Sequence, residues 1–407
     1  MSSVMTRLAA PLCAALMLLS GCTGTSEPRP PTLLLVGAAP GGQPSLLLVE
    51  DVSATAPRGE PRLEVVPGAS RPLLAPAVAL DFEDRAGDRD AAWVLVRTAA
   101  GPGGSPPASS HLQRFTVADV DPADPIAFGE DASARVTLTE PGGTGVLDGL
   151  SLTSPTTCPV AMQVDRDGET AVVLDDPSRC GSGDHAELWL VPLAGGDPQA
   201  LEGTNDVAAL PSYLDQRDSP NSVYFLVDGI NSTHVYRQVI GDTGSERLTG
   251  LDVPEPASRL RSAAGSGDVL IVLGQEDLLS VDLATVEAAE RADTRVNARE
   301  LVVDPTGISP EVLVLDASSV AFHSTPLDPS PDIATRPAAA ATIDPVTRFG
   351  YAVDEGTLTI IDLLTGGDSD STFRPHVEPL ADLELPAGDD GPLSVVGWVR
   401  AITPDAP

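Results

Sequence analysis

Short apolar runs alternate with turn residues along nearly the whole chain after residue 31. Most runs are about five to seven residues long, rich in Val, Leu and Ile, and bounded by Gly, Pro and Asp, which favours β-strands over helices. The clearest runs are Thr32–Val36, Ser45–Val49, Ala91–Val96, Thr170–Leu174, Glu187–Val191, Ser222–Val227, Val269–Leu273, Glu311–Leu315 and Leu358–Leu363. The pattern predicts an all-β protein.

One stretch departs from this pattern. Val281–Arg295 has helix propensity, although Asp282, Thr285 and Val286 weaken it. Elsewhere the 39 Pro and 37 Gly residues fit a chain with many tight turns.

The runs repeat in units of roughly 40–50 residues, a period typical of propellers and arrays. The clearest unit spans Cys158–Gly203, where an Asp-Gly turn at Asp165–Gly168 precedes the strand Ala171–Leu174 and a further strand follows at Ala186–Leu193. Seven units can be laid out, near residues 32–70, 73–140, 148–203, 206–252, 258–295, 297–336 and 339–400.

The unit Cys158–Gly203 resembles one blade of TolB-like or WD40-like β-propellers, and Leu358–Gly367 is similar to the outer strand of surface-layer-like propellers. The resemblance implies an all-β propeller of seven blades with about four strands each, over residues 32–403. The last strand, Leu393–Arg400, would close the ring against the first blade. A pair of β-sandwiches is the alternative.

The N-terminus carries an export pattern. Arg7 precedes an apolar run, Leu8–Ser20, that is too short to span a bilayer comfortably. The run ends in Leu19-Ser20-Gly21-Cys22, which resembles the bacterial lipobox. That resemblance implies a signal peptide over residues 1–21, cleavage after Gly21, and a lipid on Cys22 as a membrane anchor. An ordinary signal peptide with an accidental cysteine is the alternative.

Residues 22–31 read as a lipidated, Pro-rich flexible tether. The expected location is therefore the cell envelope. Thr23 follows Cys22, and in cells with two membranes that pattern is similar to export to the outer membrane.

The charge balance limits the classes of partner that the protein can bind. The chain has 59 acidic and 24 basic residues, a net charge of −35, and every basic residue is Arg. Such a field repels nucleic acid and anionic head groups. The lack of Lys excludes Schiff-base chemistry and a phosphate-loop lysine.

Two cysteines remain after Cys13, in the leader, and Cys22, at the lipid site. In an exported domain, Cys158 and Cys180 favour a disulfide. A metal site would need more ligands than these two, and His185 is the only nearby candidate.

Candidate chemistry beyond the cysteines is sparse, and we assign no catalytic residue, metal site or cofactor. The histidines lack a second His at zinc-ligand spacing. Asp165–Gly168 fits a type I′ hairpin turn better than a calcium loop. Asp175 and Asp176, with Asp184 and Glu187, form either a cation site or, more simply, a solvated loop. The histidines, expected on strands or the surface, and the tryptophans, expected as packing anchors, are His111, His185, His234, His323, His376, Trp93, Trp189 and Trp398.

Three functions remain open. The first is a lipid-anchored, non-catalytic envelope propeller that binds a protein partner. The second is a propeller hydrolase or lactonase-type enzyme with acids and His around the central channel. The third, a solute-binding or sensing role, has no feature in its favour.

Overall fold

A computed structural model describes residues 32–401 apart from several segments. The segments left out are 39–41, 52–62, 86–87, 99–108, 120–135, 140–145, 152–157, 166–167, 182–184, 202–203, 205–206, 209–210, 216–221, 243, 276, 286, 294–297, 304–311, 317, 325–327, 335–337, 345–348, 355, 364–377, 385–386, 389–390 and 393–394. The predicted signal peptide and tether therefore lie outside the described residues, as do Cys13, Cys22, Asp184 and His376.

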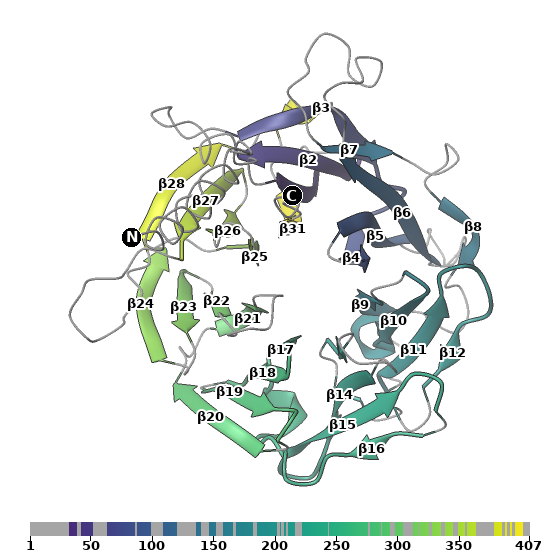
Figure 1. Cartoon of the computed structure of the whole chain (residues 1–407), viewed down its shortest axis with the longest axis vertical. Coiled ribbons are helices and arrows are strands. Elements are labelled where there is room, and N and C mark those ends of the chain that lie inside the picture. The colour runs from purple at the N-terminus through teal and green to yellow at the C-terminus, as the bar shows by residue number, and fades with distance from the viewer. Residues whose placement is uncertain are drawn as a thin grey trace, which may run out of the picture.

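Seven antiparallel sheets form a ring of blades around a central axis (Figure 1). The strands of each blade are named in order from the innermost to the outermost. Blade 1 holds β31 (Val395–Ala401), β1 (Thr32–Ala38), β2 (Ser45–Asp51) and β3 (Leu63–Pro72); blade 2 holds β4 (Ala77–Arg85), β5 (Asp88–Thr98), β6 (Ser109–Asp119) and β7 (Val136–Thr139), with β8 (Val146–Ser151) also paired to β6; blade 3 holds β9 (Pro159–Val164), β10 (Thr170–Asp175), β11 (Glu187–Pro192) and β12 (Gln199–Ala200).

The remaining blades follow the same order. Blade 4 holds β13 (Tyr213–Asp215), β14 (Ser222–Asp228), β15 (Thr233–Val239) and β16 (Glu246–Arg247); blade 5 holds β17 (Ser262–Ser266), β18 (Val269–Leu273), β19 (Asp277–Asp282) and β20 (Glu287–Asp293); blade 6 holds β21 (Ala298–Val303), β22 (Val312–Asp316), β23 (Val320–Ser324) and β24 (Asp328–Ala334); blade 7 holds β25 (Ala340–Ile343), β26 (Phe349–Asp354), β27 (Thr357–Asp362) and β28 (Glu378–Glu384). A small hairpin pairs β29 (Ala387–Gly388) with β30 (Gly391–Pro392).

The predicted seven-blade β-propeller is confirmed, and the blades follow the predicted units closely. One boundary differs: β8, placed by the repeat at the junction with the third unit, pairs with β6 in blade 2. The second strands of the blades are buried along most of their length, as in β10 and β22. Because neighbouring blades cover both of their faces, these strands are continuous apolar runs instead of alternating ones.

The helix propensity of Val281–Arg295 is overridden. Part of this stretch forms β19 and β20, which pair from Asp277↔Asp293 to Asp282↔Glu287. The Oδ1 atom of Asp282 accepts the N–H groups of Ala284 and Thr285, which turns the chain between the two strands.

The ring is closed by the C-terminal strand, as predicted. β31 pairs antiparallel with β1, from Leu33↔Ala401 to Ala38↔Val395, and completes blade 1 from the inside. The first and last described strands therefore belong to one sheet, which leaves no open edge between blades 7 and 1.

Apolar side chains fill the space between blades. Among the described residues, seven buried clusters lie one between each pair of neighbouring blades. Trp93 is 1% exposed in the cluster of blades 2 and 3, which confirms it as a packing anchor. Trp189 is half-buried on β11, and Trp398 lies outside the residues whose side chains are described.

Side-chain hydrogen bonds also join blades. Asp81 on β4 accepts the Val164 N–H at 2.6 Å, and Gln163 on β9 accepts the Leu214 N–H at 2.6 Å. Each bond satisfies a backbone donor on the next blade, so it fixes the angle between neighbours.

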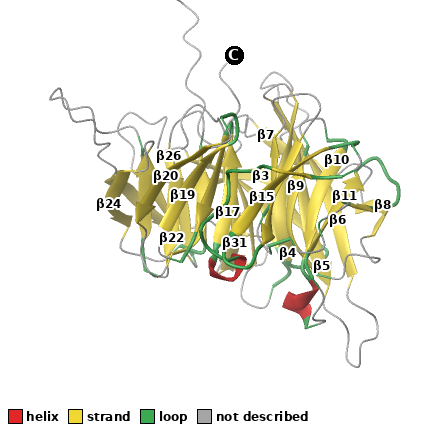
Figure 2. Ribbon diagram, turned by 90° about the horizontal axis from the view of Figure 1, so that it is seen from below, coloured by secondary structure: helices red, strands yellow, loops and turns green. Residues whose placement is uncertain are grey.

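The two faces of the ring differ. The described turns between second and third strands, and the described connections from an outermost strand to the next innermost strand, lie on one side, which we call the loop face. The only helices in the described part of the chain, η3 (Pro177–Cys180) and η4 (Ala257–Arg259), both lie there (Figure 2). Neither has the length or the apolar character to cross a membrane.

Candidate functional site

The disulfide predicted between Cys158 and Cys180 is present on the loop face, with the Cα atoms 6.0 Å apart. Cys158 lies just before β9 and is 2% exposed, whereas Cys180 ends η3 and is exposed. The bond ties the β10–β11 connection to the start of blade 3. On the loop-entropy model it stabilises the fold by about 3 kcal/mol.

The carboxylates beside the disulfide are buried, so the expectation of a solvated loop is wrong. Asp175 and Asp176 are each 3% exposed. Asp175 Oδ1 accepts the Cys158 N–H at 2.6 Å. Asp176 caps η3 by accepting the Ser178 N–H at 3.2 Å and lies 3.2 Å from Arg179 Nε. Both carboxylates therefore hold the loop in place.

The Asp-Gly turn of blade 3 is wider than predicted. The Asp165 N–H donates to the Thr170 carbonyl, so four residues lie between these partners, where a type I′ turn has two. Gly168 has a φ of 66°. Asp165 Oδ1 accepts the Glu169 N–H at 2.7 Å, so this carboxylate stabilises the turn.

The described histidines lie away from the central channel. His111, His234 and His323 are on third strands, β6, β15 and β23, and His185 is exposed in the β10–β11 connection. They are strand and surface residues, as expected. Among the innermost strands, β9, β17 and β25 have no acidic, His or Cys residue, whereas β4, β13 and β21 each carry acidic residues. In the described part of the chain, no three His, Cys, Asp or Glu residues lie together in a way that could hold a metal ion.

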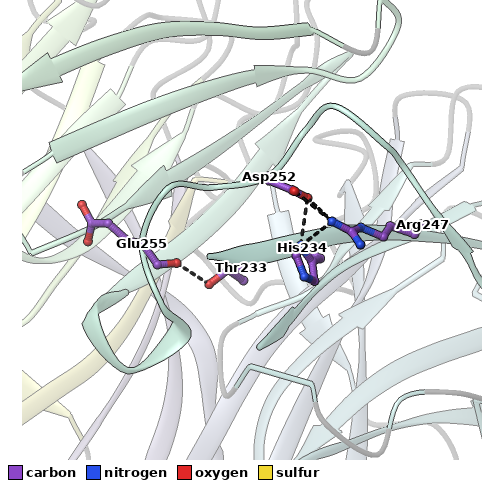
Figure 3. Close-up of polar contacts among 5 residues, drawn as sticks. All are labelled: Thr233, His234, Arg247, Asp252 and Glu255. Atoms are coloured by element: carbon purple, nitrogen blue, oxygen red, sulfur yellow. Dashed lines mark hydrogen bonds and ion pairs between the residues drawn. The ribbon is translucent and has the colours of Figure 1, made fainter. Parts of the chain in front are cut away.

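The richest polar cluster on the loop face is at the rim of blade 4 (Figure 3). His234 is the second residue of β15, and Arg247 is the last residue of β16. Asp252 lies on the segment that leads from β16 to η4. Asp252 Oδ1 is 2.8 Å from His234 Nδ1, and Arg247 Nη2 donates to both carboxylate oxygens at 2.9 and 2.8 Å. Nothing in the sequence marks this group, because its members come from three separate segments.

Burial opposes ionisation of Asp252, but the hydrogen bonds from Arg247 and His234 outweigh it and lower its pKa. Arg247 Nη2 is also 2.9 Å from His234 Nδ1. That nitrogen either accepts from Arg247 or, when protonated, donates to Asp252. Because Arg247 and Asp252 are each 39% exposed, the pair contributes at most about 1 kcal/mol.

The returning segment is also held by the backbone. Thr233 and Val253 exchange two backbone hydrogen bonds, at 2.9 and 2.8 Å. The Thr233 hydroxyl donates to the Glu255 carbonyl at 2.8 Å (Figure 3). The Asp228 carboxylate accepts the Ala257 N–H at the start of η4. The connection from blade 4 to blade 5 is thus tied to the β14–β15 hairpin.

A small cleft, open to solvent, lies between this connection and blade 5. Its walls are mainly apolar, with two carboxylate residues among them. Gly274 permits the close approach of the Glu255 carboxylate, since a Cβ there would lie 2.8 Å from both oxygens. The lining residues are Val253, Pro254, Glu255, Leu260, Val272, Gly274, Asp277 and Leu279.

An apolar side chain is exposed on the β14–β15 turn, to which this connection is tied. Ile230, at the tip of the β14–β15 turn, is 96% exposed. The turn is compact: a Cβ on Gly229 would lie 2.7 Å from His234 Nε2, so glycine lets the ring pack against the turn. The rim of blades 4 and 5 therefore presents an exposed isoleucine on a fixed turn, beside a cleft with acidic and apolar walls. We call this surface the blade 4–5 rim.

No protein-family model and no curated protein matches the chain. A structure of a nidogen/laminin complex is similar over 74% of this chain and 92% of its own, at 10% identity and a TM-score of 0.40. A structure of U3-55K is similar over 81% of this chain and 86% of its own, at 11% identity and a TM-score of 0.46.

Proposed function

We propose that this β-propeller is a lipid-anchored envelope protein whose loop face binds another protein without catalysing a reaction. The observation that carries the proposal is the blade 4–5 rim. Its loops are fixed by hydrogen bonds and ion pairs, and it presents Ile230 almost fully exposed. A prearranged surface loses little conformational entropy when a partner binds.

The chemistry of the rim suggests the kind of partner. Glu255 and Asp277 line the cleft, Asp252 lies at its edge, and the whole chain carries a net charge of −35. A partner surface with an apolar centre to cover Ile230 and with Arg or Lys around it would be complementary in shape and charge.

Cross-linking at one defined position tests the binding role. A photoreactive residue replaces Ile230 in envelopes of the source cell, and Asp197, exposed in the β11–β12 turn on the opposite face, carries it in a matched control. We expect a discrete cross-linked protein at position 230 only. Equal labelling at both positions, or none at position 230, would contradict the proposal.

The membrane anchor is supported by the order of charge, apolar run and Leu19-Ser20-Gly21-Cys22. Replacing Cys22 by Ala removes the only thiol in the lipobox position. We expect loss of fatty-acid labelling and either release from membranes or accumulation of uncleaved precursor, measured by fractionation and mass spectrometry. Cys13→Ala, a change within the leader, is the matched control and should leave both unchanged. Mature, membrane-bound Cys22→Ala protein would refute the anchor.

A further inference from the structure

The two sulfur atoms of the disulfide lie in different surroundings. Cys180 is exposed at the end of η3, whereas Cys158 is 2% exposed and sits beneath the loop. Thiol–disulfide exchange requires the attacking thiolate to approach along the S–S axis from one end. A small thiol in solution therefore reaches Cys180 more readily than Cys158.

The buried sulfur has a cation beside it. Arg97, at the end of β5 in blade 2, places Nη1 3.3 Å from Cys158 Sγ. Its Nε atom is buried and has no hydrogen-bond partner among the described residues. The Arg97 guanidinium is thus the cation in contact with the buried sulfur.

Two buried carboxylates lie nearby. Asp175 accepts the Cys158 N–H, and Asp176 binds Ser178 and Arg179. Burial and the Asp175 charge oppose a thiolate at Cys158, whereas Arg97, whose Nη1 contacts Sγ, stabilises one. Access favours attack at Cys180, and the Arg97 charge favours departure of Cys158.

We propose that the Cys158–Cys180 bond is a thiol-exchange site, at which a small thiolate becomes attached to Cys180 while Cys158 leaves as a thiolate beside Arg97. The bond between the two cysteines breaks, and a new S–S bond joins the incoming sulfur to Cys180. The electron pair of the broken bond stays on Cys158. The only co-reactant is a thiol in its deprotonated form, and the exchange removes the covalent link between η3 and the start of β9.

The site of attack can be measured on the native sequence around the disulfide. The full chain, with Cys13→Ser and Cys22→Ser so that two cysteines remain, is treated briefly with 2-mercaptoethanol, quenched in acid and alkylated. We expect mass spectrometry to find the mercaptoethanol adduct on Cys180 and the alkyl group on Cys158. Adducts on Cys158, or equal amounts on both, would overturn the proposal.

The role of the cation is tested by rate. The rate of reduction should rise linearly with thiol concentration, because the attack needs no unfolding. Arg97→Gln should slow it about five- to tenfold, given that a leaving thiol of higher pKa departs more slowly. Arg97→Lys, which keeps the charge, should retain most of the rate, and Arg114→Gln, on the neighbouring strand β6, should match the parent.

Two results would count against the mechanism: a rate that reaches a plateau with thiol concentration, or Arg97→Gln reacting as fast as the parent. If Arg97→Gln fails to fold, the adduct mapping on the parent still decides the site of attack. None of these outcomes depends on the blade 4–5 rim or on the lipid, so they leave the proposed function untouched.

Discussion

Buried aspartates shape the turns of the loop face. Asp316, at the β22–β23 turn, is 4% exposed and accepts the N–H groups of Ser318 and Ser319 and both of their hydroxyls. Burial opposes its ionisation, but these hydrogen bonds outweigh that and lower its pKa below 3.8. A carboxylate with this environment is a structural part of the hairpin.

The lowered pKa of Asp316 makes a pH-dependent prediction. Because the folded-state pKa is lower than the unfolded one, the ionised group stabilises the fold above pH 3.8, and this contribution is lost as the pH falls through the folded-state value. Asp316→Asn should lower the free energy of unfolding by about 1 kcal/mol at pH 7. Urea unfolding should show that the difference in unfolding free energy between the parent and Asp316→Asn becomes smaller below pH 3.8. A difference that grows with acid would contradict the assignment, and Asp197→Asn is the exposed control.

Asp175 predicts a larger effect at a single residue. Asp175→Ala leaves the buried Cys158 N–H without its acceptor, which should cost about 2 kcal/mol of unfolding free energy. Chemical denaturation of the oxidised protein measures it, with Asp197→Ala as the control. Equal stability of the two variants would show that this hydrogen bond is dispensable.

The sequence predicts the disulfide from its cysteine count and the compartment, but not the burial of Asp175 and Asp176. Two adjacent acids beside Gly and Ser look solvent-exposed along the chain. Their burial follows from the Cys158 N–H and from Arg179, and the Asp175–Cys158 contact joins positions 17 residues apart. For the same reason Arg97 and Arg247 could not be singled out, since their partners come from other segments of the chain.

At the scale of elements, the strands were predictable because both of their faces are buried. A five-residue run such as Val312–Asp316 reads as a strand without any knowledge of its neighbours. The error at Val281–Arg295 has the opposite cause. β20 is an outermost strand with Ala and Glu in its sequence, so pairing with β19 decides its structure against local helix propensity.

Contact between blades 4 and 5 supplies a prediction of this scale. A Cβ on Gly265 would lie 2.1 Å from the Tyr213 ring, whose hydroxyl donates to the Gly267 carbonyl at 2.9 Å. Gly265→Ala should therefore push the tyrosine away and destabilise the protein by about 2 kcal/mol.

A double-mutant cycle separates this effect from a general loss of stability. Adding Tyr213→Ala should make Gly265→Ala cost much less, because the clash is gone. Additive free energies of unfolding would show that the two residues do not share one contact. Tyr213→Phe measures how much the hydrogen bond from the Tyr213 hydroxyl contributes to the free energy of unfolding.

For the whole molecule, closure through β31 is the decisive feature. Ending the chain after Ser394 removes the inner strand of blade 1, including Val399, which is fully buried between blades 1 and 7. We expect loss of the cooperative unfolding transition and association of the protein through the exposed edge of β1, seen by calorimetry and size-exclusion chromatography.

Ending the chain after Ala401 is the matched truncation and should leave the transition unchanged. A cooperative monomer with the shorter chain would mean that six complete blades suffice. The repeat predicts seven units from the sequence, but the strand that joins the two ends was identified only by its position at the end of the seventh unit.

The antiparallel pairing of β1 with β31, with Leu33 opposite Ala401, sets the side of the ring on which β1 begins. β1 runs from Thr32 toward the side of the β10–β11 and β14–β15 turns, so its first residue emerges from the far side. A lipid attached upstream of β1 would orient the propeller with the side opposite the loop face toward the bilayer. Ile230 and the exposed Cys180, both on the loop face, would then face away from the bilayer.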